Sequence, residues 1–230
     1  MKTLSFVFIL ITAFTLSTKA QYVYLQGGLN LANIAKTNDG QTEKNNVLPT
    51  FNVGLMGRLG LSSSVDVESG ILFTGQGSRA ETYFNGGNDY VKSKFNPYYL
   101  QVPANLIVKI PIERNSGIFF NAGPYVAMGI GGKSTSEQKI GPLYSSSTKS
   151  IDFSNDDPFT SEEEDAGYNR LKRFDFGLNF GGGLEFRHVI LKVNYGLGLA
   201  KINSTESDNN ANDRNKYRTV SFSLGIPLGK

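Results

Sequence analysis

The chain has 230 residues, of which 39% are hydrophobic and 12% aromatic, with 26 glycines and one histidine. It contains no cysteine, which excludes disulfides, thiolate metal sites and a lipid-anchored cysteine. A single histidine also leaves little scope for metal or acid–base chemistry, and we expect neither a cofactor nor catalytic or metal-ligating residues. This mixture is typical of a sheet with one apolar face and one small, polar face.

Residues 1–20 have the features of a secretory signal peptide. Lys2 supplies the positive start, and an apolar stretch from Leu4 to Leu16 is too short for a membrane-spanning helix. Small residues at Thr18 and Ala20 predict cleavage before Gln21. Removing two lysines from the 23 basic residues leaves 21 against 20 acids, a mature net charge near +1. That balance argues against nucleic acid as a partner.

The mature chain, residues 21–230, alternates apolar and polar residues with a period of two. This period is the signature of β-strands with two different faces. No further apolar run is long enough for a transmembrane helix, so a membrane location would require a closed barrel. The alternating segments, in chain order, cover residues 24–31, 51–61, 65–74, 98–109, 118–129, 174–186, 189–199 and 219–228.

About eight such strands predict an all-β fold, a closed, antiparallel, up-and-down transmembrane barrel. The connections support it because they alternate in length. Short turns are expected at 62–64, 111–117 and 187–188, and long polar loops at 32–48, 78–96, 132–170 and 201–218. In such barrels the short turns and both termini are periplasmic. Pro103 and Pro124 cannot donate to a ladder, so we expect a bulge or local irregularity where they meet.

Seven strand segments carry recognisable motifs: Gly27 to Asn30, Tyr99 to Lys109, Gly123-Pro124-Tyr125, Arg173 to Gly177, Gly181 to Phe186, Tyr195 to Leu199 and Leu224-Gly225-Ile226. Together these segments resemble one known family, the PorT-like outer-membrane β-barrel proteins. The resemblance spans essentially the whole mature chain and implies an outer-membrane barrel of a gram-negative cell. It implies little about function, although the founding member is tied to protein secretion across the outer membrane.

Seven charged residues fall on the polar face of the strands. A charge in the lipid-facing band would cost about 2–4 kcal/mol at mid-depth, so we expect them to point into the lumen as a structural network of mixed sign. An ion path is the alternative, but eight strands leave an interior only just filled by side chains. The seven are Arg58, Asp66, Glu68, Lys109, Asp175, Glu185 and Lys192.

The turn at 62–64 is short enough to fix the register of its hairpin. Counting back from it places Arg58 opposite Glu68, with Asp66 one diagonal step away. We therefore expect the arginine to be held between two carboxylates. On the opposite, lipid-facing side we expect aromatic girdles: Phe51, Phe73, Tyr98 and Phe174 at the outer rim, and Phe120 and Phe186 at the inner rim.

Three motifs suggest ligands but fail on their details. The segment Gly129 to Ser134 resembles a phosphate-binding loop, yet Ala127 stands where the motif needs glycine. Residues 208–219 begin like a calcium loop but lack its glycine and its final glutamate. The acidic residues between 156 and 165 leave loose divalent-cation binding open, although a solvated loop is favoured. His188 lies in a turn without a partner for catalysis.

We therefore expect a non-enzymatic outer-membrane barrel whose partners are membrane lipids and, through its long loops, other envelope or secretion proteins. Its function would be envelope structure, adhesion or a place in a secretion assembly. Two alternatives remain. A soluble, lipocalin-like periplasmic carrier would need an apolar interior, and an outer-membrane hydrolase would need a partnered histidine.

Overall fold

A computed structural model describes residues 21–38, 41–44, 47–113, 116–154, 170–202 and 215–228. The predicted signal peptide, the whole acidic segment at 156–165 and residues 208–214 of the calcium-like segment lie outside the described residues. Within these ranges, no helix has the length and apolar character needed to cross a membrane.

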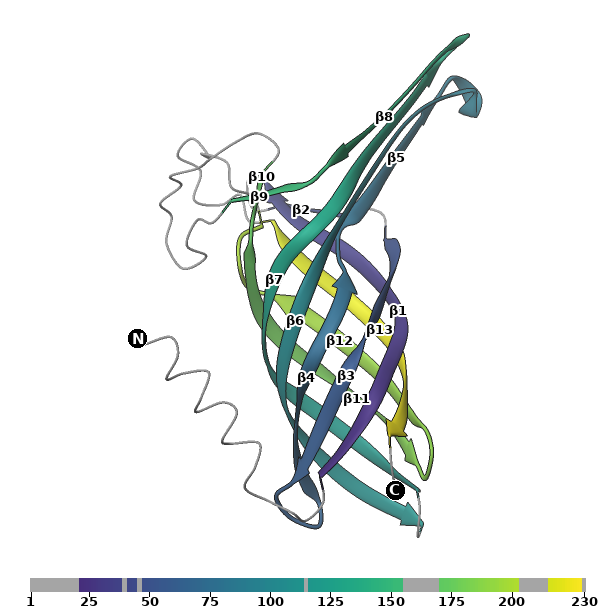
Figure 1. Cartoon of the computed structure of the whole chain (residues 1–230). Coiled ribbons are helices and arrows are strands. Elements are labelled where there is room, and N and C mark those ends of the chain that lie inside the picture. The colour runs from purple at the N-terminus through teal and green to yellow at the C-terminus, as the bar shows by residue number, and fades with distance from the viewer. Residues whose placement is uncertain are drawn as a thin grey trace, which may run out of the picture.

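Eight long strands close into an antiparallel cylinder, which confirms the predicted fold (Figure 1). Around the barrel their order is β6-β4-β3-β1-β13-β12-β11-β7, and β7 closes the ring by pairing with β6. The strands are β1 (Gln21–Asn38), β3 (Leu48–Gly60), β4 (Val65–Gly75), β6 (Asp89–Glu113), β7 (Ser116–Ile140), β11 (Phe174–Phe186), β12 (Ile190–Gly198) and β13 (Lys216–Leu228).

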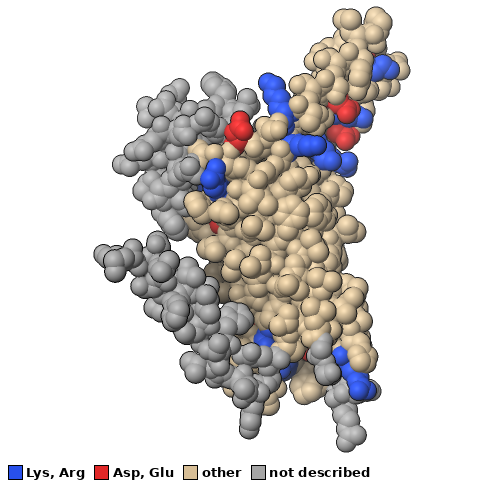
Figure 2. Space-filling view, in the orientation of Figure 1, with Lys and Arg blue, Asp and Glu red and all other residues tan. Residues whose placement is uncertain are grey.

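The pleat of each strand separates the two faces as the sequence predicts. Leu25 and Leu29 of β1 are exposed on the outside, whereas Gln26 and Asn30 between them are buried in the lumen. The other barrel strands show the same pattern, which is the reverse of that in a soluble protein. Their apolar residues lie outside, and Asn, Gln, Thr and charged residues lie inside. On the face that Figure 2 shows, charges gather above and below a broad uncharged belt. An apolar outer surface around a polar interior argues against the soluble carrier.

The predicted aromatic residues all point outward. Phe51, Phe73 and Tyr98 form one cluster on neighbouring strands, with ring centroids 5.4 to 6.1 Å apart. Phe174 lies at the start of β11, and Phe120 and Phe186 lie toward the other end of the barrel, all three exposed. Their placement fits the interfacial belts of a membrane barrel.

The short connections lie where the alternation places them. Leu61 to Ser64 join β3 to β4, and Arg187 to Val189 join β11 to β12. The first turn sets Arg58 opposite Glu68 and Gly60 opposite Asp66, as the register count predicts. Both described ends of the barrel, in β1 and β13, lie beside these turns, since Val23 pairs with Leu228. We refer to this side as the short-turn end and to the opposite side as the long-loop end.

Within the described residues, most of the predicted loops at 78–96 and 132–170 is in fact strand, so the loop prediction is wrong there. Beyond the barrel, β6 and β7 continue as a pair, and β5 (Ser78–Phe84) and β8 (Leu143–Ser150) flank them in a four-stranded arm (Figure 1). A short helix η1 (Asn85–Gly87) and a turn at Gly141, both with left-handed φ angles, close its hairpins. The arm needs no apolar face because it lies beyond the barrel, so its strands lack the alternation that marks the others.

Three short strands complete the long-loop end. β2 (Gln41–Lys44) pairs with β1, and β9 (Asp152–Ser154) pairs in parallel with β10 (Arg170–Lys172). The prolines disturb the sheet less than expected. Pro103 lies opposite Tyr125, and hydrogen-bonded pairing stops for Ala104 and Asn105 without a change of register. The irregularities of register in β6 and β7 lie instead at Tyr98/Tyr99 and Pro111/Glu113.

Candidate functional site

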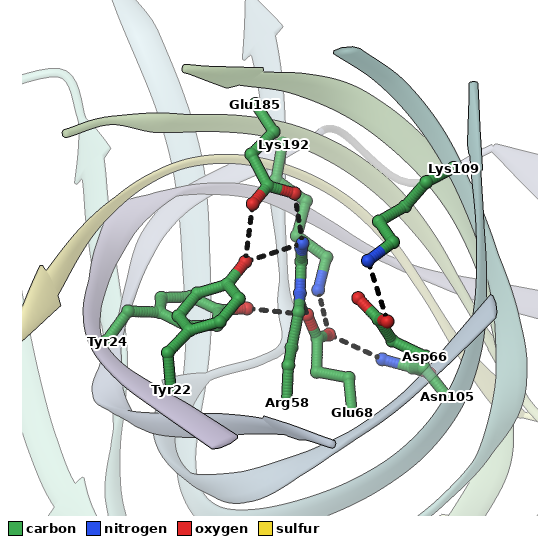
Figure 3. A network of polar contacts seen from close by, with 9 residues as sticks. All are labelled: Tyr22, Tyr24, Arg58, Asp66, Glu68, Asn105, Lys109, Glu185 and Lys192. Atoms are coloured by element: carbon green, nitrogen blue, oxygen red, sulfur yellow. Dashed lines mark hydrogen bonds and ion pairs between the residues drawn. The ribbon is translucent and has the colours of Figure 1, made fainter. Parts of the chain in front are cut away.

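Four charged side chains from four strands meet inside the barrel near the short-turn end (Figure 3). Arg58 Nε of β3 lies 2.8 Å from Glu68 Oε2 of β4, and Arg58 Nη1 lies 2.8 Å from Glu185 Oε2 of β11. Lys192 of β12 forms an ion pair with the other oxygen of Glu68. The side chains of Arg58 and Glu68 are fully buried. Two cations and two carboxylates give this charge centre a net charge of zero.

Neutral groups complete the charge centre. Tyr24 and Asn105 donate hydrogen bonds to the two oxygens of Glu68, at 2.7 and 3.1 Å. The Tyr22 hydroxyl accepts from Arg58 Nη1 at 2.9 Å and donates to Glu185 Oε1 at 2.9 Å. A buried ion pair is stable only when its remaining donors and acceptors are also satisfied, and these groups supply that.

Aromatic rings enclose the guanidinium. The centre of the Phe119 ring lies 4.6 Å from Arg58 Cζ, and the rings of Tyr24 and Tyr22 lie at 5.5 and 5.7 Å. Each ring presents its negative face to the cation, a favourable contact once both are out of water. The arginine is thereby fixed by ion pairs and ring contacts from several strands.

The remaining three predicted residues lie outside the charge centre. Asp66 pairs with Lys109, whose Nζ lies 2.8 Å from Asp66 Oδ1, so the expectation that Asp66 flanks Arg58 is wrong. Its place is taken by Glu185, which reaches Arg58 from the far side of the lumen. Asp175 lies toward the long-loop end, where it accepts a hydrogen bond from Tyr125 at 2.9 Å. The register of a hairpin gives only partners on the neighbouring strand, whereas the narrow lumen also allows contacts across it.

The alternation places Tyr24 and Asn105 on the inward face, but nothing in the sequence identifies them as ligands of Glu68. Tyr22 and Phe119 were missed. Their only signal is parity: Tyr22 shares it with Tyr24, and Phe119 shares it with Asn121. Parity gives the face of a residue and not its partner.

A second plug fills the long-loop end of the lumen. Tyr99, Tyr125 and Tyr217 are buried there, and the hydroxyls of Tyr99 and Tyr217 lie 3.1 Å apart. Ile151, just before β9, and Leu171, within β10, pack on the same cluster. Between the plugs remains a cavity of about 40 Å³, lined mainly by Asn, Gln, Thr and Ser side chains. Such a volume suits a few water molecules and not a carried ligand.

The other candidate motifs receive no support as sites. Gly129 to Ser134 lie within strand β7, and a Cβ at Gly129 would overlap the ring of Phe153, so this glycine allows close packing. His188 is exposed in the turn before β12. Among the described residues, no three His, Cys, Asp or Glu side chains are arranged to hold a metal ion.

A closed antiparallel cylinder that is apolar outside and filled with polar side chains inside defines a transmembrane β-barrel. The chain belongs to the outer membrane protein beta-barrel domain family, whose model matches residues 20–204. It is an outer-membrane protein.

Solved structures with a similar fold include three bacterial proteins. Ail, the attachment invasion locus protein of Yersinia pestis solved with the heparin analogue sucrose octasulfate, is 13% identical, with 90% of this chain and 99% of that chain covered and a TM-score of 0.39. Neisserial surface protein A is 9% identical, with 91% and 100% covered and a TM-score of 0.45. OprG of Pseudomonas aeruginosa is 13% identical, with 92% and 98% covered and a TM-score of 0.32. No curated protein matches the sequence.

Proposed function

We propose that the chain is a non-enzymatic barrel that holds the four-stranded arm at the cell surface, where the arm contacts protein partners. Its role is then adhesion, envelope structure or a place in a secretion assembly. The observation that carries the proposal is the contrast between a lumen plugged at both ends and an ordered arm that projects well beyond the barrel (Figure 1). A plugged lumen disfavours transport through the barrel. The function is therefore assigned to the arm, which projects beyond it.

The edges of the arm favour protein contact. Among the strands that the structure describes, β8 pairs only with β7 and β5 only with β6, so neither has a described partner on its other edge. All eight residues of β8 are exposed. An exposed strand edge is a template for an added strand of another chain.

The topology proposed for this function follows the usual rule for such barrels. Residues 1–20 act as a signal peptide cleaved before Gln21, and both termini and the short turns are periplasmic. The long-loop end and its arm are then extracellular. The resemblance of the strand segments to PorT-like proteins supports assignment to that branch of the family.

Single cysteines test the arm directly, because the natural chain has none. With Ser147→Cys in β8, a membrane-impermeant maleimide crosslinker should label intact cells and join the arm to a partner protein. Ser63→Cys, in the turn between β3 and β4, is the matched control and should react only after the outer membrane is permeabilised. Labelling of Ser63→Cys in intact cells would overturn the orientation. Labelling of Ser147→Cys that yields no crosslinked partner would overturn the contact function while leaving the orientation intact.

A further inference from the structure

Nearly all charged residues of the arm lie on one face of its sheet. Residues directly opposite each other on antiparallel strands share a face. Arg79 pairs with Lys94, Glu81 pairs with Lys92, and Lys92 also pairs with Glu137. Lys133 lies opposite Asn96, and Lys139 lies opposite Tyr90. This charged face therefore carries five basic and two acidic residues, a net charge of +3, whereas the other face carries Asp89 and Lys149.

The charged face of the arm continues the lipid-facing surface of the barrel. Along β6, Lys94 follows the outward-facing Leu100 and Tyr98 at even spacing, and the register shift between Tyr98 and Tyr99 adds no residue to β6. Phe95, on the opposite face, packs on the buried plug at the long-loop end. Lys94 is four residues beyond Tyr98, about 13 Å along the strand. The basic residues at the base of the arm thus lie just beyond the aromatic cluster of Phe51, Phe73 and Tyr98.

A groove of about 520 Å³ opens on this face, between the base of the arm and the start of β3. Its lining combines the buried Leu48 and the exposed Pro49 of β3 with residues of the arm. The charged ones are three basic residues, Arg79, Lys92 and Lys94, and two acidic residues, Glu81 and Glu137, which leave the groove with a net charge of +1. Arg79 Nη1 lies 3.6 Å from Glu81, and Lys92 lies over the Tyr90 ring at 4.5 Å. Within the described ranges, Lys94 and Lys133 form no ion pair. Figure 2 shows basic side chains, with acidic ones among them, gathered at the base of the arm, above the uncharged belt.

We propose that this groove binds the phosphate group of a glycolipid in the outer leaflet of the outer membrane. An aromatic cluster facing lipid marks the membrane interface, and lipid phosphates lie just beyond it. Basic side chains at that level meet the phosphate, while Pro49 and the aromatic cluster contact the adjoining apolar part of the same lipid. This continuity with the lipid-facing surface favours a membrane lipid over a soluble anion. The inference rests on the proposed orientation of the barrel and is independent of the arm's protein contacts.

Binding is measured on the folded full chain in a neutral detergent by native mass spectrometry with monophosphorylated lipid A. Arg79→Gln with Lys94→Gln should raise the Kd roughly tenfold, because each removes one charge from the phosphate site. The matched control, Lys139→Gln with Lys149→Gln, removes the same two charges from the far end and the other face of the arm. It should bind like the natural chain. Both pairs are exposed and should leave folding unchanged.

Two further probes distinguish the source of the phosphate. The Kd of the natural chain for lipid A without phosphate should be at least as high as the Kd of the Arg79/Lys94 variant for the phosphorylated lipid. Inorganic phosphate at millimolar concentration should not displace the lipid. Equal losses in the two variants, insensitivity to the lipid's phosphate, or displacement by free phosphate would each overturn the proposal. Because the measurement is made in micelles, its failure is distinct from a failure of the orientation or of arm-mediated contact in cells.

Discussion

Glu68→Gln should lower the temperature at which the heat-modifiable folded band is lost on a gel by roughly 10 °C, for a loss of about 3 kcal/mol. Glu68 is fully buried and balances both Arg58 and Lys192. Glutamine keeps the shape of the side chain but leaves the two cations facing one carboxylate, Glu185. Removing one member of a buried ion network is strongly destabilising because it leaves a charge uncompensated.

The same reasoning predicts partial rescue. Adding Lys192→Met to Glu68→Gln restores neutrality, because Arg58 and Glu185 remain paired, so the double variant should melt above the single one. Glu137→Gln, which alters an arm glutamate outside the barrel, is the control and should leave the transition unchanged. A harmless Glu68→Gln, or a double variant that simply adds the two losses, would show that the charge centre does not stabilise the barrel.

Gly28→Val should abolish the folded band altogether, whereas Gly27→Val should not. Gly28 faces the lumen, and a Cβ there would overlap the backbone of Phe222 and Ser223 on the paired strand β13. That backbone cannot move away without breaking the β1–β13 ladder. Gly27 faces outward, and a Cβ there meets nothing within 4 Å.

The two neighbouring glycines therefore form a matched pair for gel and circular dichroism measurements of the refolded protein. Valine at position 27 adds apolar surface toward lipid and should leave the transition temperature equal or higher. If both variants fold, the contact between β1 and β13 is looser than the structure has it. If neither folds, the glycines are needed for some property other than the space beside β13.

The barrel could be predicted from the sequence because its two environments impose a period of two on every strand. Leu25 and Leu29 alternate with Gln26 and Asn30, and that parity already assigns each side chain to lipid or lumen. The pairing of Arg58 with Glu68 could also be predicted from the sequence, because a short turn allows only one register for its hairpin.

Two features escaped sequence reasoning for physical reasons. Contacts across the lumen, such as Arg58 with Glu185, depend on strand stagger and barrel diameter, which alternation does not encode. The arm escaped because Thr135, Ser136 and their neighbours are polar on both faces, so the strands that extend β6 and β7 look like loop. Its phosphate-binding groove therefore had no counterpart among the predicted sites.

Cell fractionation tests the central claim most directly. The full-length gene is expressed in a gram-negative host, and the mass and location of the mature protein are measured. We expect a heat-modifiable protein in the outer-membrane fraction. Its measured mass should equal that of a chain that begins at Gln21. Recovery of the mature protein in the soluble periplasmic fraction would contradict an outer-membrane barrel.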